Sequence, residues 1–407
     1  MSTLVYRLAF FLSLFGMFTF GAIDMTRGVA APLMQSGWHL SYLQLGYLFT
    51  INSLGYLLGS FIAGWILDRF GISACSKAGA LLSSMGLIGV LQSPNYELAM
   101  VSFAFVGTGT GVLEIGVNGI VPLISREPSD NSRRFNTLHG FYGVGCVIFP
   151  VLAAWLMHRS GNWQSGYWLT SALMITLFLA TLFFPYRKVA PSKESPVKNT
   201  LKVTKQHSPW RSPVFFGFAT ALTVYVMIES GLASWLPTYM VHVHRTTLHV
   251  GSLYLTGFYF LFTCGRLSGQ FWVHRLGEYR SIYLAGSLLL LSLLVTVCFP
   301  STTVLLMVAG AGCSVIFPTV VAIASHAFPR NVGTVLGILF TAAGIGSLAI
   351  NTIIGFLATE LGLQKAFWIF PLLVAFVLLS VLATHLLDNR RRTAIEMAIR
   401  DTADYPI

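Results

Sequence analysis

The sequence predicts an all-α membrane protein in which twelve transmembrane helices form two pseudo-symmetric halves of six helices each. Two observations predict this class: 55% of the 407 residues are hydrophobic while only 10% are charged, and long apolar runs recur along the whole chain. Such a composition excludes a soluble domain and is typical of proteins that cross a membrane several times. A third observation, a residue-specific match between the halves of the chain, predicts the pseudo-symmetry.

Twelve apolar runs are each long enough to cross a bilayer as a helix. They cover residues 7–35, 43–67, 73–92, 97–125, 134–157, 165–185, 213–240, 248–273, 280–299, 303–326, 332–359 and 365–387. We therefore predict an N-terminal half (1–185), a linker (186–212), a C-terminal half (213–387) and a cytoplasmic tail (388–407). The linker carries seven Lys and Arg against one Glu, and we expect it to be flexible, cytoplasmic and either solvated or in contact with anionic lipid.

The charges of the loops predict the orientation of the chain. With both termini in the cytoplasm, twenty of the 25 Lys and Arg fall on the cytoplasmic side, three outside (Arg159, Arg245, Lys365) and two within spans (Arg27, Arg266). This asymmetry follows the positive-inside rule. We expect an integral protein of a bacterial-type cell (inner) membrane, and we attribute the net charge of +11 to orientation rather than to nucleic-acid binding.

The two halves repeat each other at specific residues. Asp24 and Glu229 lie 205 residues apart, and each precedes a proline by eight positions, Pro32 and Pro237. At an offset of 206, Gly59, Arg69 and Gly71 correspond to Gly265, Arg275 and Gly277. Repeats of this kind place a solute site between the halves near the bilayer midplane, where rocking of one half against the other gives alternating access.

A carboxylate stands in the middle of the fourth apolar run, within the stretch GTGTGVLEIGVNGIVP at residues 107–122. At that depth an ionised Glu114 costs at least ~2.5 kcal/mol, so it needs a partner, water or a proton. Asn118 follows one helical turn later on the same face. We interpret Glu114 and Asn118 as a substrate or proton site, while a carboxylate paired to a neighbouring helix remains the alternative.

The loop after the second run reads GWILDRFG at residues 64–71. It resembles the signature loop of the major facilitator superfamily, with Gly64, Asp68, Arg69 and Gly71 at the expected intervals. The resemblance covers essentially the whole chain and implies a conformational latch at this loop. In the second half His274 stands where the aspartate would be, so we expect the latch to be one-sided.

Four further stretches narrow the resemblance: residues 16–24, Leu113 with Glu114 and Asn118, residues 134–145 followed by Pro150, and residues 265–269. Together they resemble the fucose permease-like branch, the fucose–galactose–glucose:proton symporters. The resemblance implies that Asp24 and Glu114 bind substrate and couple protons. Arg27 departs from the pattern, and an ion pair with Asp24 would hold that carboxylate ionised, which puts the proton role of Asp24 in doubt.

Other candidates complete the predicted site. Asn136, Tyr142, Glu229 and Trp235 are assigned to substrate binding, with packing as an equal alternative for the last two. Arg266 either pairs with a buried carboxylate or extends to the membrane interface. His242, His244 and His249 have no acidic or thiol neighbour, and the five cysteines match no metal framework, so we expect neither a metal nor a cofactor.

These features predict a secondary transporter, not an enzyme. No nucleotide-binding motif is present, so the energy must come from an ion gradient or from the gradient of the solute. We expect proton-coupled uptake of a small neutral polyhydroxylated solute by a monomer whose partners are that solute, protons and membrane lipid. Proton-driven efflux of drugs or metabolites and a transport-fold sensor remain the alternatives.

Overall fold

The computed structural model describes residues 2–124, 128–186, 212–328 and 332–403, and almost all of them are helical. The helices are α1 (Ser2–Gly37), α2 (Tyr42–Gln92), α3 (Tyr96–Ile124), α4 (Pro128–Ser160), α5 (Ser165–Phe183), α6 (Pro213–His242), α7 (Leu248–Leu276), α8 (Glu278–Cys298), the 3₁₀ turn η3 (Pro300–Thr302), α9 (Leu305–Cys313), α10 (Ile316–Ala327), α11 (Val332–Leu361), α12 (Leu363–Ala366) and α13 (Ile369–Ala403). The predicted linker at 186–212 falls, apart from its end residues, outside the described part of the chain.

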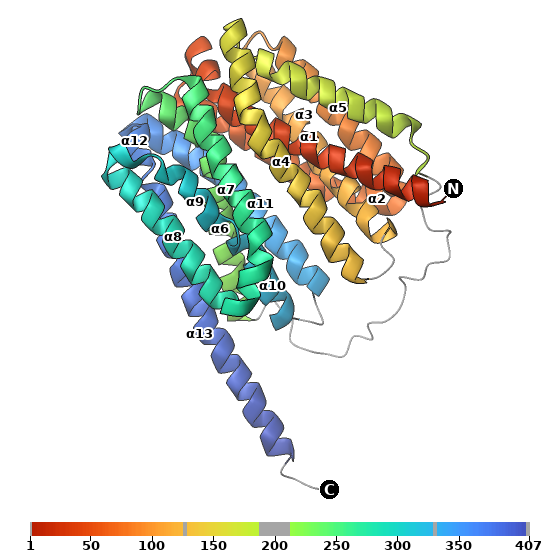
Figure 1. Ribbon diagram of the computed structural model, residues 1–407, viewed down its shortest axis with the longest axis vertical. Helices are drawn as coiled ribbons and strands as arrows, with labels where there is room; N and C mark the ends of the chain where they lie inside the picture. The colour runs from red at the N-terminus through yellow and green to blue at the C-terminus, as the bar shows by residue number, and fades with distance from the viewer. Residues whose placement is uncertain (1, 125–127, 187–211, 329–331, 404–407) are drawn as a thin grey trace.

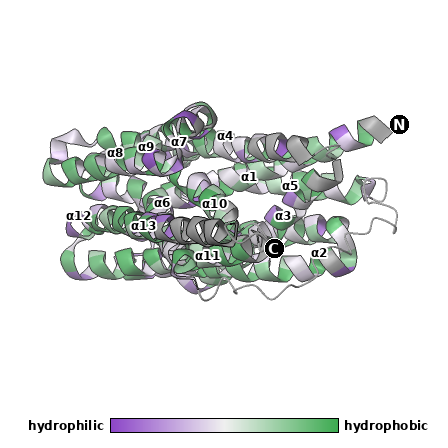
Figure 2. Cartoon of the chain, turned by 90° about the horizontal axis from the view of Figure 1, so that it is seen from below, coloured by the Kyte–Doolittle hydropathy of each residue, from purple (hydrophilic) through white to green (hydrophobic). Residues whose placement is uncertain are grey.

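The prediction of twelve membrane crossings is confirmed. Eleven helical segments of the described chain are long and apolar enough to span a membrane, with α2 supplying two of them and with α9–α10 and α12–α13 each forming one. The twelfth crossing is α7, which has 29 residues but is less apolar because it carries Arg266 and other polar residues. Hydrophobic residues predominate along the helices in Figure 2, as lipid-facing surfaces require.

The backbone carries the repeat that the sequence predicts. Gly71 interrupts α2 with φ of 78°, and Gly277 separates α7 from α8 with φ of 88°. Residues with a side chain rarely adopt this left-handed region, which glycine enters at little cost. The second and third crossings of each half are thus joined by the same kind of turn, at positions that correspond in the sequence match.

The halves meet mainly through three helix pairs of the described chain: α2 with α11, α4 with α7, and α1 with α6. Figure 1 shows the N-terminal half in red to yellow and the C-terminal half in green to blue, with their helices diverging toward the chain termini. The end of the molecule away from the termini, where the halves are joined, is called the closed end here. It comprises the N-terminal part of α2 and the C-terminal parts of α1, α6 and α11.

Hydrogen bonds join the halves at the closed end. The Tyr42 hydroxyl lies 3.3 Å from Nδ1 of His242, the Leu43 amide donates to the Thr359 hydroxyl at 3.0 Å, and the hydroxyls of Thr50 and Thr352 are 2.7 Å apart. Deeper in the molecule the Thr256 hydroxyl donates to the Val147 carbonyl at 3.1 Å. Neutral bonds of this kind contribute ~0.5–1.5 kcal/mol each, so the closed end can reopen.

Close backbone contact accompanies these bonds. A Cβ on Gly46 of α2 would lie 2.5 Å from the carbonyl oxygen of Asn351 and 3.2 Å from Cα of Gly355, both on α11. A Cβ on Gly28 of α1 would meet the Ala233 carbonyl oxygen of α6 at 2.5 Å. Small residues at such crossings let membrane helices approach closely. The closed end therefore depends on glycine at these positions.

We predict that Gly46→Val opens the closed end. The added side chain would overlap the α11 backbone, at a cost of about 1–3 kcal/mol, which corresponds to a roughly 5–150-fold change in the ratio of the two states. Labelling of single cysteines from each side of the membrane measures this ratio. Gly37→Val is the matched control because a Cβ there meets nothing within 4 Å. Unchanged labelling at both ends in the Gly46 variant would contradict the prediction.

Candidate functional site

The site is built around an ion pair in the middle of α1. Nη2 of Arg27 lies 3.9 Å from Oδ1 of Asp24, one helical turn away. The other carboxylate oxygen of Asp24 accepts a hydrogen bond from the Tyr142 hydroxyl of α4 at 2.9 Å. The Asp24 side chain is 25% exposed although it stands in mid-span, so it faces accessible space rather than a sealed core. The structure thus brings together three of the residues singled out in the sequence.

Arg27 is fixed by α2. It donates a hydrogen bond to Oδ1 of Asn52, and its guanidinium lies 5.5 Å from the centre of the Phe49 ring. Asn52 in turn donates to the Phe103 carbonyl of α3 at 3.0 Å and is almost fully buried. Sequence reasoning missed Asn52, although an amide in the middle of an apolar run is a usable signal for a buried polar contact.

A small cavity adjoins the ion pair. Asp24, Arg27, Asn52 and Tyr167 line it together with apolar side chains, and its volume is about 10 Å³. Nε of Arg27 and the hydroxyl of Tyr167 are buried without a hydrogen-bond partner among the described residues. A space of this size holds about one water molecule. The cavity is therefore too small for a solute and has room for about one water molecule beside these two residues.

Glu114 of α3 belongs to the same network. Its carboxylate accepts a hydrogen bond from the Tyr56 hydroxyl of α2. The Phe20 ring stacks on Tyr56 with centroids 6.1 Å apart and lies 5.2 Å from the ring of Tyr142, so Phe20 separates the two carboxylate–tyrosine pairs. Tyr56 was not a sequence candidate, because unlike Tyr142 it lies in none of the stretches that carry the family resemblance. In the described chain no cation forms an ion pair with Glu114.

Asn118 stands one turn beyond Glu114, as predicted. Its side-chain oxygen is buried and has no hydrogen-bond partner within the described ranges. Buried polar atoms in native proteins almost always have partners. Asn118 is therefore available to water, to a solute or to a residue that approaches in another conformation.

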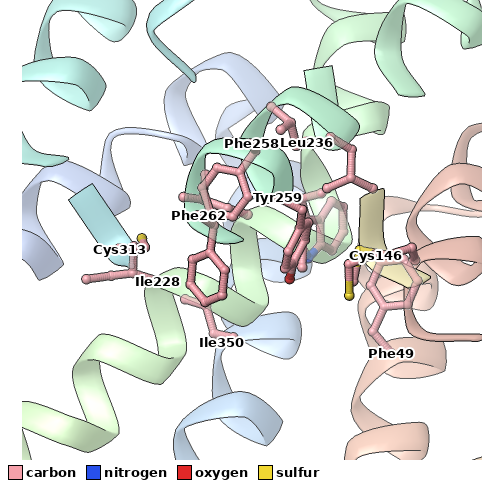
Figure 3. Packing of buried hydrophobic residues seen from close by; sticks show 14 of the residues in the cluster. Phe49, Cys146, Ile228, Leu236, Phe258, Tyr259, Phe262, Cys313 and Ile350 are labelled. Atoms are coloured by element: carbon pink, nitrogen blue, oxygen red, sulfur yellow. The ribbon is translucent and has the colours of Figure 1, made fainter. Parts of the chain in front are cut away.

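Glu229 approaches the centre from the opposite half. The thiol of Cys146 on α4 lies close enough to Asp24, Glu229 and Arg266 for their charges to act on it. Tyr259 of α7 is likewise within range of Cys146 and both carboxylates. Figure 3 shows Cys146 and Tyr259 next to each other in the packing between the halves. The two carboxylates related by the repeat thus converge on one region from α1 and α6.

Arg266 and Trp235 are held by packing and hydrogen bonds in this structure, and for Trp235 this is the packing alternative that the sequence left open. Nε of Arg266 donates to the Ser314 carbonyl at 3.2 Å and its guanidinium lies over the Phe262 ring at 4.2 Å, while no described carboxylate is within ion-pair distance. Trp235 is fully buried, donates to Asn351 at 3.2 Å and packs edge-on against Phe49. In this conformation Trp235 belongs to the closed end and lines no accessible cavity.

The predicted latch loop is described in part. Gly64 and Arg69 are exposed, Gly71 makes the left-handed turn, and the Arg69 guanidinium lies 5.5 Å from the ring centres of both Trp65 and Phe70. The side chains of Asp68 and Asn136 lie outside the described part of the structure. The latch role of the loop and the binding role of Asn136 stay predictions.

A double-mutant cycle tests the link between Arg27 and Asn52. We expect Arg27→Gln and Asn52→Ala to be non-additive by about 1.5–3 kcal/mol, the contribution of a hydrogen bond to a charged group. The free energy of unfolding in mixed micelles measures it. Ser53→Ala replaces Asn52→Ala in the control cycle, since Ser53 is also buried on α2. Equal coupling in both cycles would show that the bond contributes nothing specific.

Comparisons with known proteins agree with this architecture. The sequence model of the Major Facilitator Superfamily matches residues 12–303 and 246–396. A Protein TsgA homolog of Buchnera aphidicola is 24% identical over 264 residues, which are 64% of this chain and 65% of that protein's length. An uncharacterized MFS-type transporter, YfkL of Bacillus subtilis, is 24% identical over 86% of this chain and 89% of its own. Protein TsgA of Shigella flexneri is 22% identical over 85% and 86%.

Solved structures show the same fold. The nucleoside transporter NupG superimposes with a TM-score of 0.75 at 13% identity, covering 93% of this chain and 99% of its own. An inward-facing, occupied bacterial homolog of the human lysosomal transporter Spinster gives 0.72 at 14% identity over 95% and 97%. The transporter FucP in the outward conformation gives 0.63 at 20% identity over 93% and 99%. Identities this low establish the fold alone.

Proposed function

This chain belongs to the Major Facilitator Superfamily and is a transporter rather than an enzyme, and from that premise we propose that it takes up a small neutral polyhydroxylated solute together with protons. The observation that carries the proposal is the pair of mid-membrane carboxylates, Asp24 and Glu114, each bonded to a tyrosine hydroxyl. Carboxylates at this depth are rare and mark substrate or proton pathways.

The chemistry around the carboxylates supports a sugar-like solute. Hydroxyl groups of a sugar can replace the tyrosine hydroxyls that now occupy the carboxylate oxygens, and the ring of Phe20 between them offers an apolar face. The negative charge of Asp24 is already matched by Arg27, so the pair neither requires nor favours a charged solute. The similarity to FucP, whose solved structure is described as a Major Facilitator Superfamily transporter, supports the transporter fold of the proposal and not the class of solute.

Glu114 is the better candidate for the coupled proton. Asp24 has a cationic partner, whereas the hydrogen bond to Glu114 comes from a neutral hydroxyl. A membrane-embedded carboxylate without a counter-ion is stable only if it carries a proton or meets water. Protonation of Glu114 on one side of the membrane and release on the other would couple the solute to the proton gradient.

The closed end supports the conformational change that the proposal requires. With both termini in the cytoplasm, as the positive-inside rule favours, the closed end lies outside and the helices diverge toward the cytoplasm. Breaking the bonds between α2 and α11 and between α2 and α6 would let the halves rock about α4 and α7. The same carboxylates would also serve proton-driven efflux of drugs or metabolites, and the direction of accumulation decides between the two.

We predict that Glu114→Gln separates exchange from accumulation. Gln keeps the shape and can accept the Tyr56 hydrogen bond but cannot carry the exchangeable proton. Counterflow of the solute in proteoliposomes should persist, its pH dependence should disappear, and uptake driven by an imposed pH gradient should fall at least about tenfold. Glu97→Gln is the matched control, because Glu97 is exposed in the first turn of the same helix.

Other outcomes have distinct meanings. If the Glu114 variant still concentrates solute in response to a pH gradient, Glu114 is not the coupling residue. If a panel of labelled sugars shows no counterflow with the unaltered protein while nucleosides, organic acids or cationic dyes do, that result would contradict a sugar-like solute but not the transport function. Ligand-induced thermal stabilisation over the same panel separates failure to bind from failure to translocate.

A further inference from the structure

A groove between α4 and α5 opens on the side of the N-terminal half near the closed end. Leu152, Leu156 and Leu169 line it together with Trp155 and Trp168, and its volume is about 570 Å³. Figure 1 shows α4 and α5 meeting at a tight hairpin and diverging away from it. The groove is wide open on its outer side, so it suits a chain lying along the helices rather than an enclosed ligand. Its apolar lining matches a hydrocarbon chain. It contains none of the polar residues of the transport site.

The groove extends from the apolar part of the membrane to its boundary. The α4 span ends at Ser160 and the α5 span begins at Ser165, so the hairpin between them marks the membrane surface. Trp155 and Trp168 are 48% and 66% exposed. Tryptophan is enriched at the level of lipid headgroups, with its apolar ring toward the chains. One end of the groove therefore lies among headgroups and the other among acyl chains.

A positive charge stands at the headgroup end. The Arg159 guanidinium lies 4.8 Å from the centre of the Trp155 ring, and no carboxylate of the described chain forms an ion pair with it. The hydroxyls of Ser160 and Ser165 are at the same end, where they bond to the Asn162 carbonyl at 3.2 and 2.7 Å. Arg159 is also one of only three basic residues on this side in the predicted topology. Arg159 is exposed, so its guanidinium is accessible to an anionic group at the level of the headgroups.

We propose that this groove binds an anionic phospholipid of the phosphatidylglycerol type, with one acyl chain against the leucines and its phosphate on Arg159. The planar guanidinium can donate two parallel hydrogen bonds to phosphate oxygens. An acyl chain would cover the apolar lining, and free phosphate has no such chain. The single positive charge favours a lipid with net negative charge over a zwitterionic lipid, whose headgroup cation would stand near the same arginine.

Native mass spectrometry of the detergent-solubilised protein tests the proposal with phosphatidylglycerol and phosphatidylcholine of identical chains. We expect the first lipid to bind more tightly and Arg159→Gln to lose about fivefold of that affinity, the effect of one basic residue at a membrane surface. The affinity of Arg159→Lys for phosphatidylglycerol should fall between those of the unaltered protein and Arg159→Gln. Lys365→Gln is the matched control, because it removes one exposed charge on the same side, outside the groove.

A second measurement locates the lipid. Phosphatidylglycerol with brominated chains should quench the fluorescence of Trp168, isolated as the difference between the unaltered protein and Trp168→Phe. The quenching should exceed that by brominated phosphatidylcholine and should drop in Arg159→Gln. Equal affinity for the two lipids, an equal loss in Lys365→Gln, or absence of quenching at Trp168 would each overturn the site. Displacement of the lipid by inorganic phosphate alone would assign Arg159 to a soluble anion and overturn it as well.

Discussion

The ion pair between Asp24 and Arg27 ties α1 to three other helices of its half. Tyr142 connects the carboxylate to α4, and Asn52 connects the guanidinium to α2 and, through the Phe103 carbonyl, to α3. Charges in mid-membrane are tolerated only when they are paired and hydrogen-bonded. Breaking the pair would therefore cost free energy, and its hydrogen bonds hold the helices of the N-terminal half together.

The contact between the halves is of another kind. Inside the N-terminal half, glycines such as Gly107 and Gly111 press α3 against α2 along most of its length. Between the halves, a few neutral hydrogen bonds and the close contacts at Gly28 and Gly46 gather at the closed end, and the bond from Thr256 to Val147 lies deeper. Alternating access requires strong bonding within each half and weak bonding between the halves. The halves move as rigid bodies, so the contacts between them must break at a small cost in free energy.

The repeat preserves the fold but not the chemistry. Asp24 and Glu229 occupy corresponding positions, and Gly71 and Gly277 make corresponding turns. Asp24 has a cation one turn away, whereas no cation of the described chain forms an ion pair with Glu229, and Arg266 of the same half is held by a backbone carbonyl and Phe262. A duplicated backbone thus presents two carboxylates in unlike surroundings, so the two need not have the same role.

The sequence by itself determined the crossings, the repeat and the carboxylates at the centre. Span length and the cost of an ionised group in hydrocarbon are local properties that a single helix already has. Only the tertiary structure decided the partners: Asn52 on Arg27, Tyr56 on Glu114, Ser314 on Arg266, and Trp235 packed into the closed end. Which side chains meet depends on how each helix is rotated and which distant segment packs against it, and no local pattern encodes either.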